Sequence, residues 1–151
     1  DKDIIILNGE DVSKKIREAD VTKMTSIISA IIPVRQKMTE LQRKMTIGKN
    51  VIVEGRDIGT VVFPNADLKI YLDASEEVRA KRRYKENIEK GMNVTYEEVL
   101  EQVRWRDNND RNKKVGALKK ADDAIVIDSS NMTIDEVVNE IKNEILKIQN
   151  K

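Results

Sequence analysis

The residues best suited to chemistry form the run EGRDIGTVVFP at positions 54–64. Arg56 and Asp57 stand between two glycines, directly after a short apolar run at residues 51–53. Such a run is typical of a buried strand in a parallel sheet, and ligands of these sheets bind beyond the carboxyl ends of the strands. The Arg–Asp pair therefore suits a nucleotide or another phosphorylated ligand. A tight turn with a surface ion pair is the alternative interpretation of the same letters.

A second candidate run, RWRDNNDRNKK, occupies residues 104–114. Arg106 and Asp110 are four residues apart, as are Asp107 and Arg111, so each pair shares one face of a helix. Alternating charges of this kind are typical of a solvated helix face. In the functional interpretation, the arginines bind phosphates while a carboxylate binds the hydroxyls of a ribose.

The basic run RAKRRY at residues 79–84 contains two adjacent arginines, Arg82 and Arg83. A lid that closes basic residues over a triphosphate would have this composition, and so would an ordinary exposed helix. Ser26 and Arg35 are polar positions beside two apolar helical segments, and neither stands out by itself.

The composition narrows the chemistry that these residues can perform. The 151 residues include no histidine and no cysteine, which excludes an imidazole base, a disulfide and a thiolate metal site. Carboxylates, lysines, arginines and backbone groups remain, and we assign no metal ligand. The net charge of +1 and the few aromatic side chains disfavour an RNA-binding domain. We find neither a signal peptide nor an apolar run of bilayer length, so we expect a cytoplasmic protein without a membrane partner.

The hydrophobic pattern predicts strands that alternate with helices, and Asn8-Gly9 predicts a hairpin turn. The predicted strands are residues 4–7, 51–53, 68–72 and 124–128. The predicted helices are residues 20–31, 34–46, 76–90, 96–112 and 133–148. This alternation is typical of the α/β class, with a parallel sheet and helices on both faces. The segment before Asp20 is expected to be an appendage to that α/β body.

Taken together, the motifs and their order resemble the bacterial cytidylate kinase family. Residues 54–64 resemble the family's GRD(I/M)GTVVFP motif, residues 10–13 its (G)EDVS element, and residues 106–112 its RDxxDRxR-like element. The resemblance covers essentially the whole chain. It implies a P-loop kinase-type parallel sheet with helices on both faces and a small insertion that binds the nucleoside monophosphate. Residues 1–50 are then the insertion, and residues 51–151 are the α/β core with a short lid near residues 80–92.

The resemblance also implies an activity, namely transfer of the γ-phosphoryl group of ATP, with Mg²⁺, to CMP or dCMP. Enzymes of this kind depend on positioning and charge neutralisation more than on acid–base chemistry. Carried over by position, the cytosine-recognising side chains are Ser26, Arg35 and Asp57. The residues that would hold the phosphate and sugar are Arg56, Arg106 and Asp110, with Arg111 as a weaker candidate. The lid residues over ATP are Arg82 and Arg83, which with Arg56 and Arg106 make up the expected catalytic set.

Two departures from the family pattern qualify this assignment. Lys113 stands where the family usually has a base-contacting arginine, and lysine lacks the planar fork that makes paired hydrogen bonds. The sequence also contains no GxxxxGK[ST] motif, which in this family lies upstream and binds the ATP phosphates. We therefore expect an N-terminal segment to be missing and this chain alone to be inactive and prone to self-association, whereas the complete protein would be a monomer. The alternatives are a kinase for another pyrimidine monophosphate and a catalytically dead nucleotide-binding module.

Overall fold

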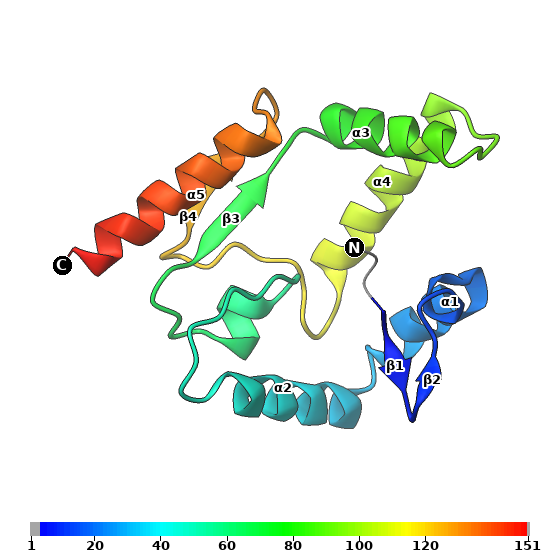
Figure 1. Ribbon diagram of the computed structural model, residues 1–151. Coiled ribbons are helices and arrows are strands. Elements are labelled where there is room, and N and C mark those ends of the chain that lie inside the picture. Colours follow the sequence, from blue (N-terminus) through cyan, green and yellow to red (C-terminus); the bar gives the residue numbers. More distant parts are fainter. Residues whose placement is uncertain (1–3, 151) are drawn as a thin grey trace. The chain divides into compact units, whose positions relative to one another are not determined.

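The computed structural model describes residues 4–150, apart from the side chains of Ala19, Thr22, Lys23 and Ser26. The chain divides into two compact units, one that ends at Val51 and one that begins at Ile52 (Figure 1). Each unit has its own secondary structure, so the elements that position the chemistry can be followed within one unit at a time.

The first unit opens with a two-stranded antiparallel hairpin of β1 (Ile6–Leu7) and β2 (Glu10–Asp11). The turn residues Asn8 and Gly9 both have positive φ angles, 52° and 85°. Two successive residues in this region make the tight turn that matches the twist of a hairpin, and asparagine and glycine tolerate it best. The predicted Asn-Gly hairpin is confirmed.

Three helical segments follow in the first unit: η1 (Lys15–Arg17), α1 (Ala19–Ile28) and α2 (Ile32–Thr46). Pro33 lies in the first turn of α2, where its missing N–H costs no helical hydrogen bond. Ile31, the residue before α2, offers no side-chain acceptor to the open N–H groups of that turn. Among the described side chains of this unit, only that of Val12 is buried, at 8% exposure.

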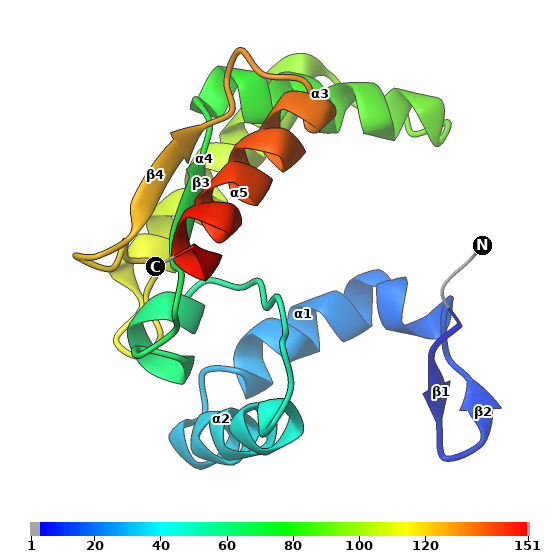
Figure 2. The same ribbon diagram turned by 60° about the vertical axis from the view of Figure 1, so that its left-hand side comes forward.

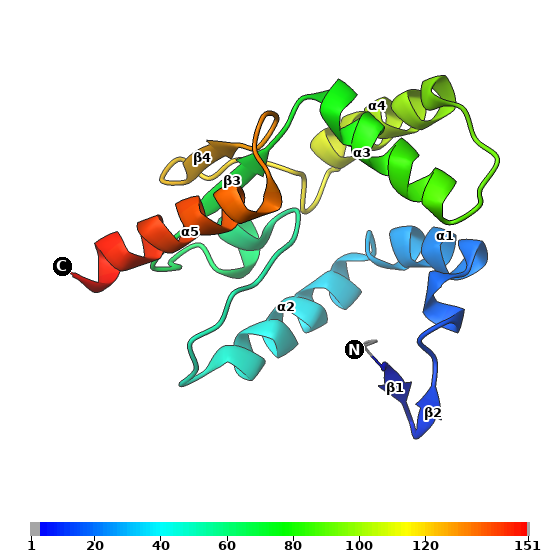
Figure 3. The ribbon, with the colours of Figure 1, turned by 45° about the horizontal axis from the view of Figure 1, so that its top comes forward.

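The second unit is built around the parallel pair β3 (Ile70–Asp73) and β4 (Ile125–Asp128), in register from Ile70 opposite Ile125 to Asp73 opposite Asp128. The chain between the two strands forms α3 (Glu76–Glu89) and α4 (Tyr96–Asn112), and α5 (Ile134–Gln149) follows β4. Helix α5 runs alongside the strands in the views of Figures 2 and 3. A parallel pair connected through helices confirms the predicted α/β class.

Helices α3 and α4 pack against each other, and their contact holds the most buried side chains of the second unit. Ala80 of α3 and Val99 of α4 are 0% and 1% exposed. Both helices begin at a side-chain cap: the Ser75 hydroxyl accepts from the Val78 N–H, and Thr95 forms a reciprocal capping box with Glu98. The sequence predicted these starts, and the structure confirms them.

The predicted strand at residues 51–53 is wrong. These residues have no regular structure, and Ile52 is 87% exposed. An apolar run becomes a strand only when a neighbouring strand pairs with its backbone, and the described residues provide none beside it. Farther along, Ile58–Val62 forms the π-helical turn η2, a rare geometry that is often found at functional sites.

Candidate functional site

The candidate site is centred on Asp110, in the last turn of α4, whose side chain is nearly buried. Its carboxylate lies 3.0 Å from the Nε of Arg56 and 2.7 Å from the Nζ of Lys113. The Nε of Arg106, one turn earlier on α4, lies 3.9 Å away. Four residues that the sequence singled out therefore meet within the second unit, and we call them the Asp110 cluster.

The Asp110 cluster carries more positive than negative charge, because three cations surround one carboxylate. The carboxylate is nearly buried, but the cations reach solvent: the side chain of Arg56 is 47% exposed and that of Arg106 is 63% exposed. Guanidinium groups in this position can donate paired hydrogen bonds to a phosphate. The carboxylate can hold the cations apart and accept hydrogen bonds from hydroxyl groups, so the arrangement suits an anion that also carries hydroxyls.

Local structure explains how α4 presents its part of the cluster. Arg106 and Asp110 share a face because they are one helical turn apart. The helix ends at Asn112, and the extended backbone of Lys113 turns the chain so that its ammonium group returns to Asp110. The N–H of Leu118 donates to the carbonyl oxygen of Asp110 at 2.7 Å, which fixes the segment that follows the helix.

Arg56 reaches the cluster from the turn that precedes η2. The carbonyl oxygen of Asp57 accepts from the N–H groups of Val61 and Val62 at 2.8 and 3.2 Å, which closes the turn directly after Arg56. A Cβ atom on Gly55 would lie 2.7 Å from the side chain of Ile58, so a larger residue there would require that side chain to move. The two glycines of the motif indicated a special backbone, but no sequence signal indicated a π-helical turn.

Arg79 and Asp107 form a second ion pair, which the sequence analysis missed. The Nη1 and Nη2 atoms of Arg79 donate to the two carboxylate oxygens of Asp107 at 2.9 and 2.6 Å. The hydrogen bonds from Arg79 hold the pKa of Asp107 below its ordinary value, and Asp107 in turn raises the pKa of Arg79. The sequence had paired Asp107 with Arg111, whose Nη2 lies 3.8 Å away. Arg79 and Asp107 are 28 residues apart, so helical spacing does not indicate their contact.

Arg82 and Arg83, which the resemblance assigned to a lid, both lie on α3 but differ in their surroundings. Arg82 donates to the carbonyl oxygen of Ser129 at 2.6 Å and to its hydroxyl at 3.2 Å. That hydroxyl donates in turn to the carbonyl oxygen of Asp73 at 3.0 Å, so Arg82 lies at the carboxyl ends of β3 and β4. Arg83 is exposed on α3. The role of both residues toward ATP stays a prediction.

The three residues assigned to cytosine lie in different units. Ser26 falls within α1, but its side chain is outside the described part of the chain. Arg35 lies on α2, where its Nη1 donates to the carbonyl oxygen of Ser29 at 3.2 Å. Asp57 belongs to the second unit and precedes η2. Their joint action on a base stays a prediction.

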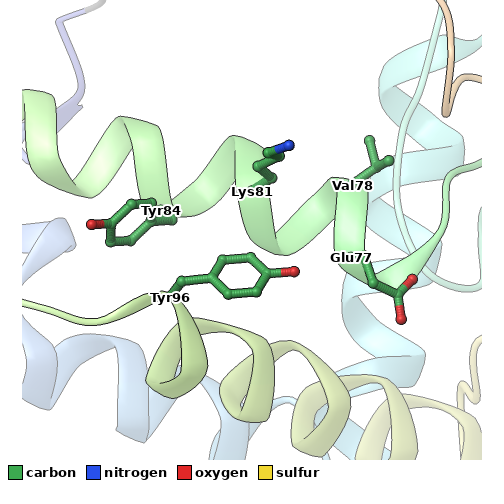
Figure 4. A pocket seen from close by; sticks show the side chains of 5 residues that line it. All are labelled: Glu77, Val78, Lys81, Tyr84 and Tyr96. Atoms are coloured by element: carbon green, nitrogen blue, oxygen red, sulfur yellow. The ribbon is translucent and has the colours of Figure 1, made fainter.

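A separate pocket of about 430 Å³ lies between α3 and α4 (Figure 4). Its lining comprises Glu77, Val78, Lys81, Tyr84 and Tyr96. The rings of Tyr84 and Tyr96 meet edge to face, with centroids 6.2 Å apart. No member of the Asp110 cluster lines it, so this pocket is distinct from the candidate site.

Two searches of the described residues gave negative results. They contain no group of three acidic, histidine or cysteine side chains arranged to hold a metal ion. None of the helices that the structure describes has both the length and the apolar character to cross a bilayer.

Comparison with known proteins agrees with the motifs of the site. The profile of the family described as "Cytidylate kinase" matches residues 1–147. The chain is 49% identical over 147 residues to the cytidylate kinase of Fusobacterium nucleatum, covering 97% of this chain and 67% of that protein. It is 48% identical to the cytidylate kinase of Thermosipho melanesiensis, covering 89% of this chain and 62% of the relative. It is 49% identical to the cytidylate kinase of Aeromonas salmonicida, covering 89% of this chain and 58% of that protein. The chain thus spans from over half to about two thirds of the length of these relatives. It belongs to the cytidylate kinase family.

Proposed function

We propose that this chain acts in the transfer of the ATP γ-phosphoryl group to a nucleoside monophosphate, with CMP or dCMP as acceptor. Membership of the cytidylate kinase family supports the reaction class. The single observation that carries the proposal is the Asp110 cluster, in which Arg56, Arg106 and Lys113 surround one nearly buried carboxylate. Three cations that reach solvent can bind the phosphate of a nucleoside monophosphate. They would also neutralise its negative charge and so reduce the electrostatic repulsion between that phosphate and the incoming phosphoryl group.

Each member of the Asp110 cluster has a proposed task. Arg56 and Arg106 bind the phosphate of the acceptor, and Asp110 accepts hydrogen bonds from the sugar hydroxyls. Lys113 adds a positive charge to the same group of side chains, but as a point charge without the paired geometry of an arginine. Asp110 also keeps the cations in place before substrate arrives, since its carboxylate is already bonded to Arg56 and Lys113.

Recognition of cytosine is assigned to Ser26, Arg35 and Asp57. Cytosine offers an amino donor beside two acceptors, the ring N3 and the O2 oxygen. A carboxylate can accept from the amino group, while an arginine and a serine hydroxyl can donate to N3 and O2. The complement is specific for cytosine over uracil, because uracil presents a carbonyl oxygen where cytosine presents the amino group.

ATP would be the phosphoryl donor, with Arg82 and Arg83 as candidate contacts to its phosphates. Mg²⁺ binds proteins through one or two carboxylates together with substrate phosphates and water, so it would accompany the nucleotide. When bound, the ion neutralises charge that develops on the transferred group. The chain contains no GxxxxGK[ST] motif, so we propose that it binds the monophosphate but does not turn over by itself.

The proposal is tested by calorimetric titration of the chain with CMP, UMP and ATP, and by a coupled assay for CDP formation. We expect CMP to bind at least about 10-fold more tightly than UMP, because each unmatched buried polar group costs more than 1 kcal/mol. Equal binding of CMP and UMP would favour a kinase for another pyrimidine monophosphate. Binding of none of them by a folded chain would contradict the proposal, and CDP formation would contradict the claim that this chain is inactive alone.

A further inference from the structure

Helix α4 carries two of the four members of the Asp110 cluster, Arg106 and Asp110, and Lys113 follows its last residue. The position of α4 in the second unit therefore decides where their charges lie. Asp107 faces the same side of α4 as Asp110, because the two are three residues apart. Asp107 is nearly buried, at 8% exposure. Its ion pair with Arg79 is one of the links between α4 and α3.

Arg79 of α3 uses all three nitrogens of its guanidinium group as hydrogen-bond donors. Two nitrogens bind the two oxygens of Asp107, and Nε donates to the carbonyl oxygen of Ala74 at 2.9 Å. Ala74 lies in the short connection between β3 and α3. One side chain therefore links the end of a sheet strand, the first turn of α3 and the face of α4 that carries Asp110.

The two hydrogen bonds between Arg79 and Asp107 constrain the orientation of the two side chains as well as their distance. Two parallel hydrogen bonds from a planar fork hold the carboxylate in one orientation, whereas a single bond would let it swing. Fixing Asp107 in this way restricts rotation of α4 about its axis and sliding along α3. Asp110 is less than one turn farther along, so the same restriction applies to its carboxylate.

We propose that Arg79 is a positioning residue for the Asp110 cluster: through Asp107 it sets the rotation of α4 and so places Arg106 and Asp110 against Arg56 for phosphate binding. The inference rests on the proposed function, because the benefit of that placement is the binding of a monophosphate. Arg79 itself does not contact substrate in this account.

The chain offers a matched control in Arg104. It also lies on α4 and also pairs with α3, through Glu76 at 3.2 Å and Glu77 at 3.7 Å. These pairs are more exposed than that of Arg79, and they include a single hydrogen bond, to Glu76, so they should constrain the helix weakly. Arg79→Met and Arg104→Met each remove one positive charge and one link between the same two helices.

The first readout is CMP affinity by calorimetry, at a temperature where circular dichroism shows each variant to be folded. We expect Arg79→Met to weaken CMP binding by about 10-fold or more and Arg79→Lys by a smaller factor, since lysine keeps the charge but loses the fork. Arg104→Met should change the affinity less than about 2-fold. If Arg79→Met does not fold, Asp107→Asn gives the same test, because asparagine keeps the shape and one acceptor oxygen.

The second readout does not depend on substrate. Exchange of the Arg56 Nε–H proton, followed by nuclear magnetic resonance, reports whether Arg56 still bonds to Asp110. We expect faster exchange in Arg79→Lys and unchanged exchange in Arg104→Met. Unchanged exchange and unchanged CMP affinity in folded Arg79 variants would overturn the positioning role. Failure of the unmodified chain to bind CMP would overturn the proposed function instead, and the exchange measurement would still decide the role of Arg79.

Discussion

The two units of this chain are stabilised in different ways. In the first unit, the described ion pairs include several between residues close in sequence, such as Lys37 with Glu40 and Lys44 with Glu40. The second unit has such local pairs as well, for example Lys90 with Glu86. It also has polar contacts between distant segments: Lys69 binds Asp123 across 54 residues, and Arg79 binds Asp107 across 28. Contacts of the first kind stabilise a helix by a few tenths of a kcal/mol, whereas contacts of the second kind fix the tertiary arrangement.

This difference between the units indicates which of them can hold side chains in the fixed geometry that a binding site needs. The Asp110 cluster lies in the unit whose helices are capped, packed and linked through buried charges. A phosphate site needs groups held close to one geometry, and such precision requires rotamers and helices that the surroundings restrict. The first unit has mostly exposed side chains among those described, so less packing restricts their positions.

The largest effect on stability is expected from Asp107→Asn. The variant leaves the partly buried guanidinium of Arg79 without its partner charge, so we expect a loss of about 3 kcal/mol in the free energy of unfolding at pH 7. The pKa of Asp107 lies below its ordinary 3.8 in the folded state, so the ionised form stabilises the fold above about pH 4. That contribution disappears as the pH falls through the folded-state pKa. Urea denaturation at pH 7 and at pH 3 should therefore show a large difference between the two chains at pH 7 and a smaller one at pH 3, and an equal difference at both would contradict the account.

Next in size is the cost of shortening the core side chains Val99 and Val12. Val99 of α4 is the more completely buried, so Val99→Ala should lower the free energy of unfolding by about 2 kcal/mol through lost burial and a residual cavity. Val12 of the first unit is also buried but has few buried neighbours, so Val12→Ala should cost about half as much. Urea denaturation measures both, and a larger loss for Val12→Ala would reverse the comparison between the units.

A smaller effect is expected at the helix starts. Thr95→Ala removes the hydroxyl that caps α4 and should cost about 1 kcal/mol. Helix α2 lacks a side-chain cap at Ile31, so Ile31→Ser should stabilise the chain by about 0.5 kcal/mol. Thermal melts followed by circular dichroism check both signs, and a stabilising Thr95→Ala would show that the capping box has no such role.

The smallest effect is expected from Glu40→Gln. Glu40 bonds to Lys44 and Lys37, which lowers its pKa, but the whole arrangement lies on an exposed helix face. Solvent and salt screen such pairs. We expect no change in the denaturation midpoint beyond experimental error at 0.15 M salt, and a clear loss would show that the first unit depends on its ion pairs after all.

The parts of the fold that the sequence predicted best are those governed by local signals. The bounds of α4 were predicted as residues 96–112, and Thr95 followed by Glu97 and Glu98 indicated its start. The strand at residues 51–53 was predicted wrongly, since an apolar run shows a tendency to be buried but not the presence of a pairing partner. The π-helical turn η2 was not predicted, because no hydrophobic periodicity indicates a single turn of this geometry.

In the candidate site, too, contacts with a local sequence signal could be predicted and contacts between distant segments could not. The pairing of Arg106 with Asp110 could be predicted from helical spacing. The contact of Arg56 with Asp110, 54 residues away, was not predicted, because the resemblance gave the two residues separate roles toward the phosphate and the sugar. The pair of Arg79 and Asp107 escaped both arguments, because its partners lie on two helices whose packing register is set by buried side chains such as Ala80 and Val99.

The central claim is that the Asp110 cluster binds the phosphate of a nucleoside monophosphate, and parallel calorimetric titrations with CMP and with cytidine test it most directly. The account predicts that CMP binds at least about 10-fold more tightly than cytidine, since charge-assisted hydrogen bonds to the phosphate add more than 1 kcal/mol. It also predicts that Arg56→Met removes most of this preference while Arg104→Met keeps it. Equal binding of CMP and cytidine by the folded chain, or a preference that survives Arg56→Met, would contradict the claim.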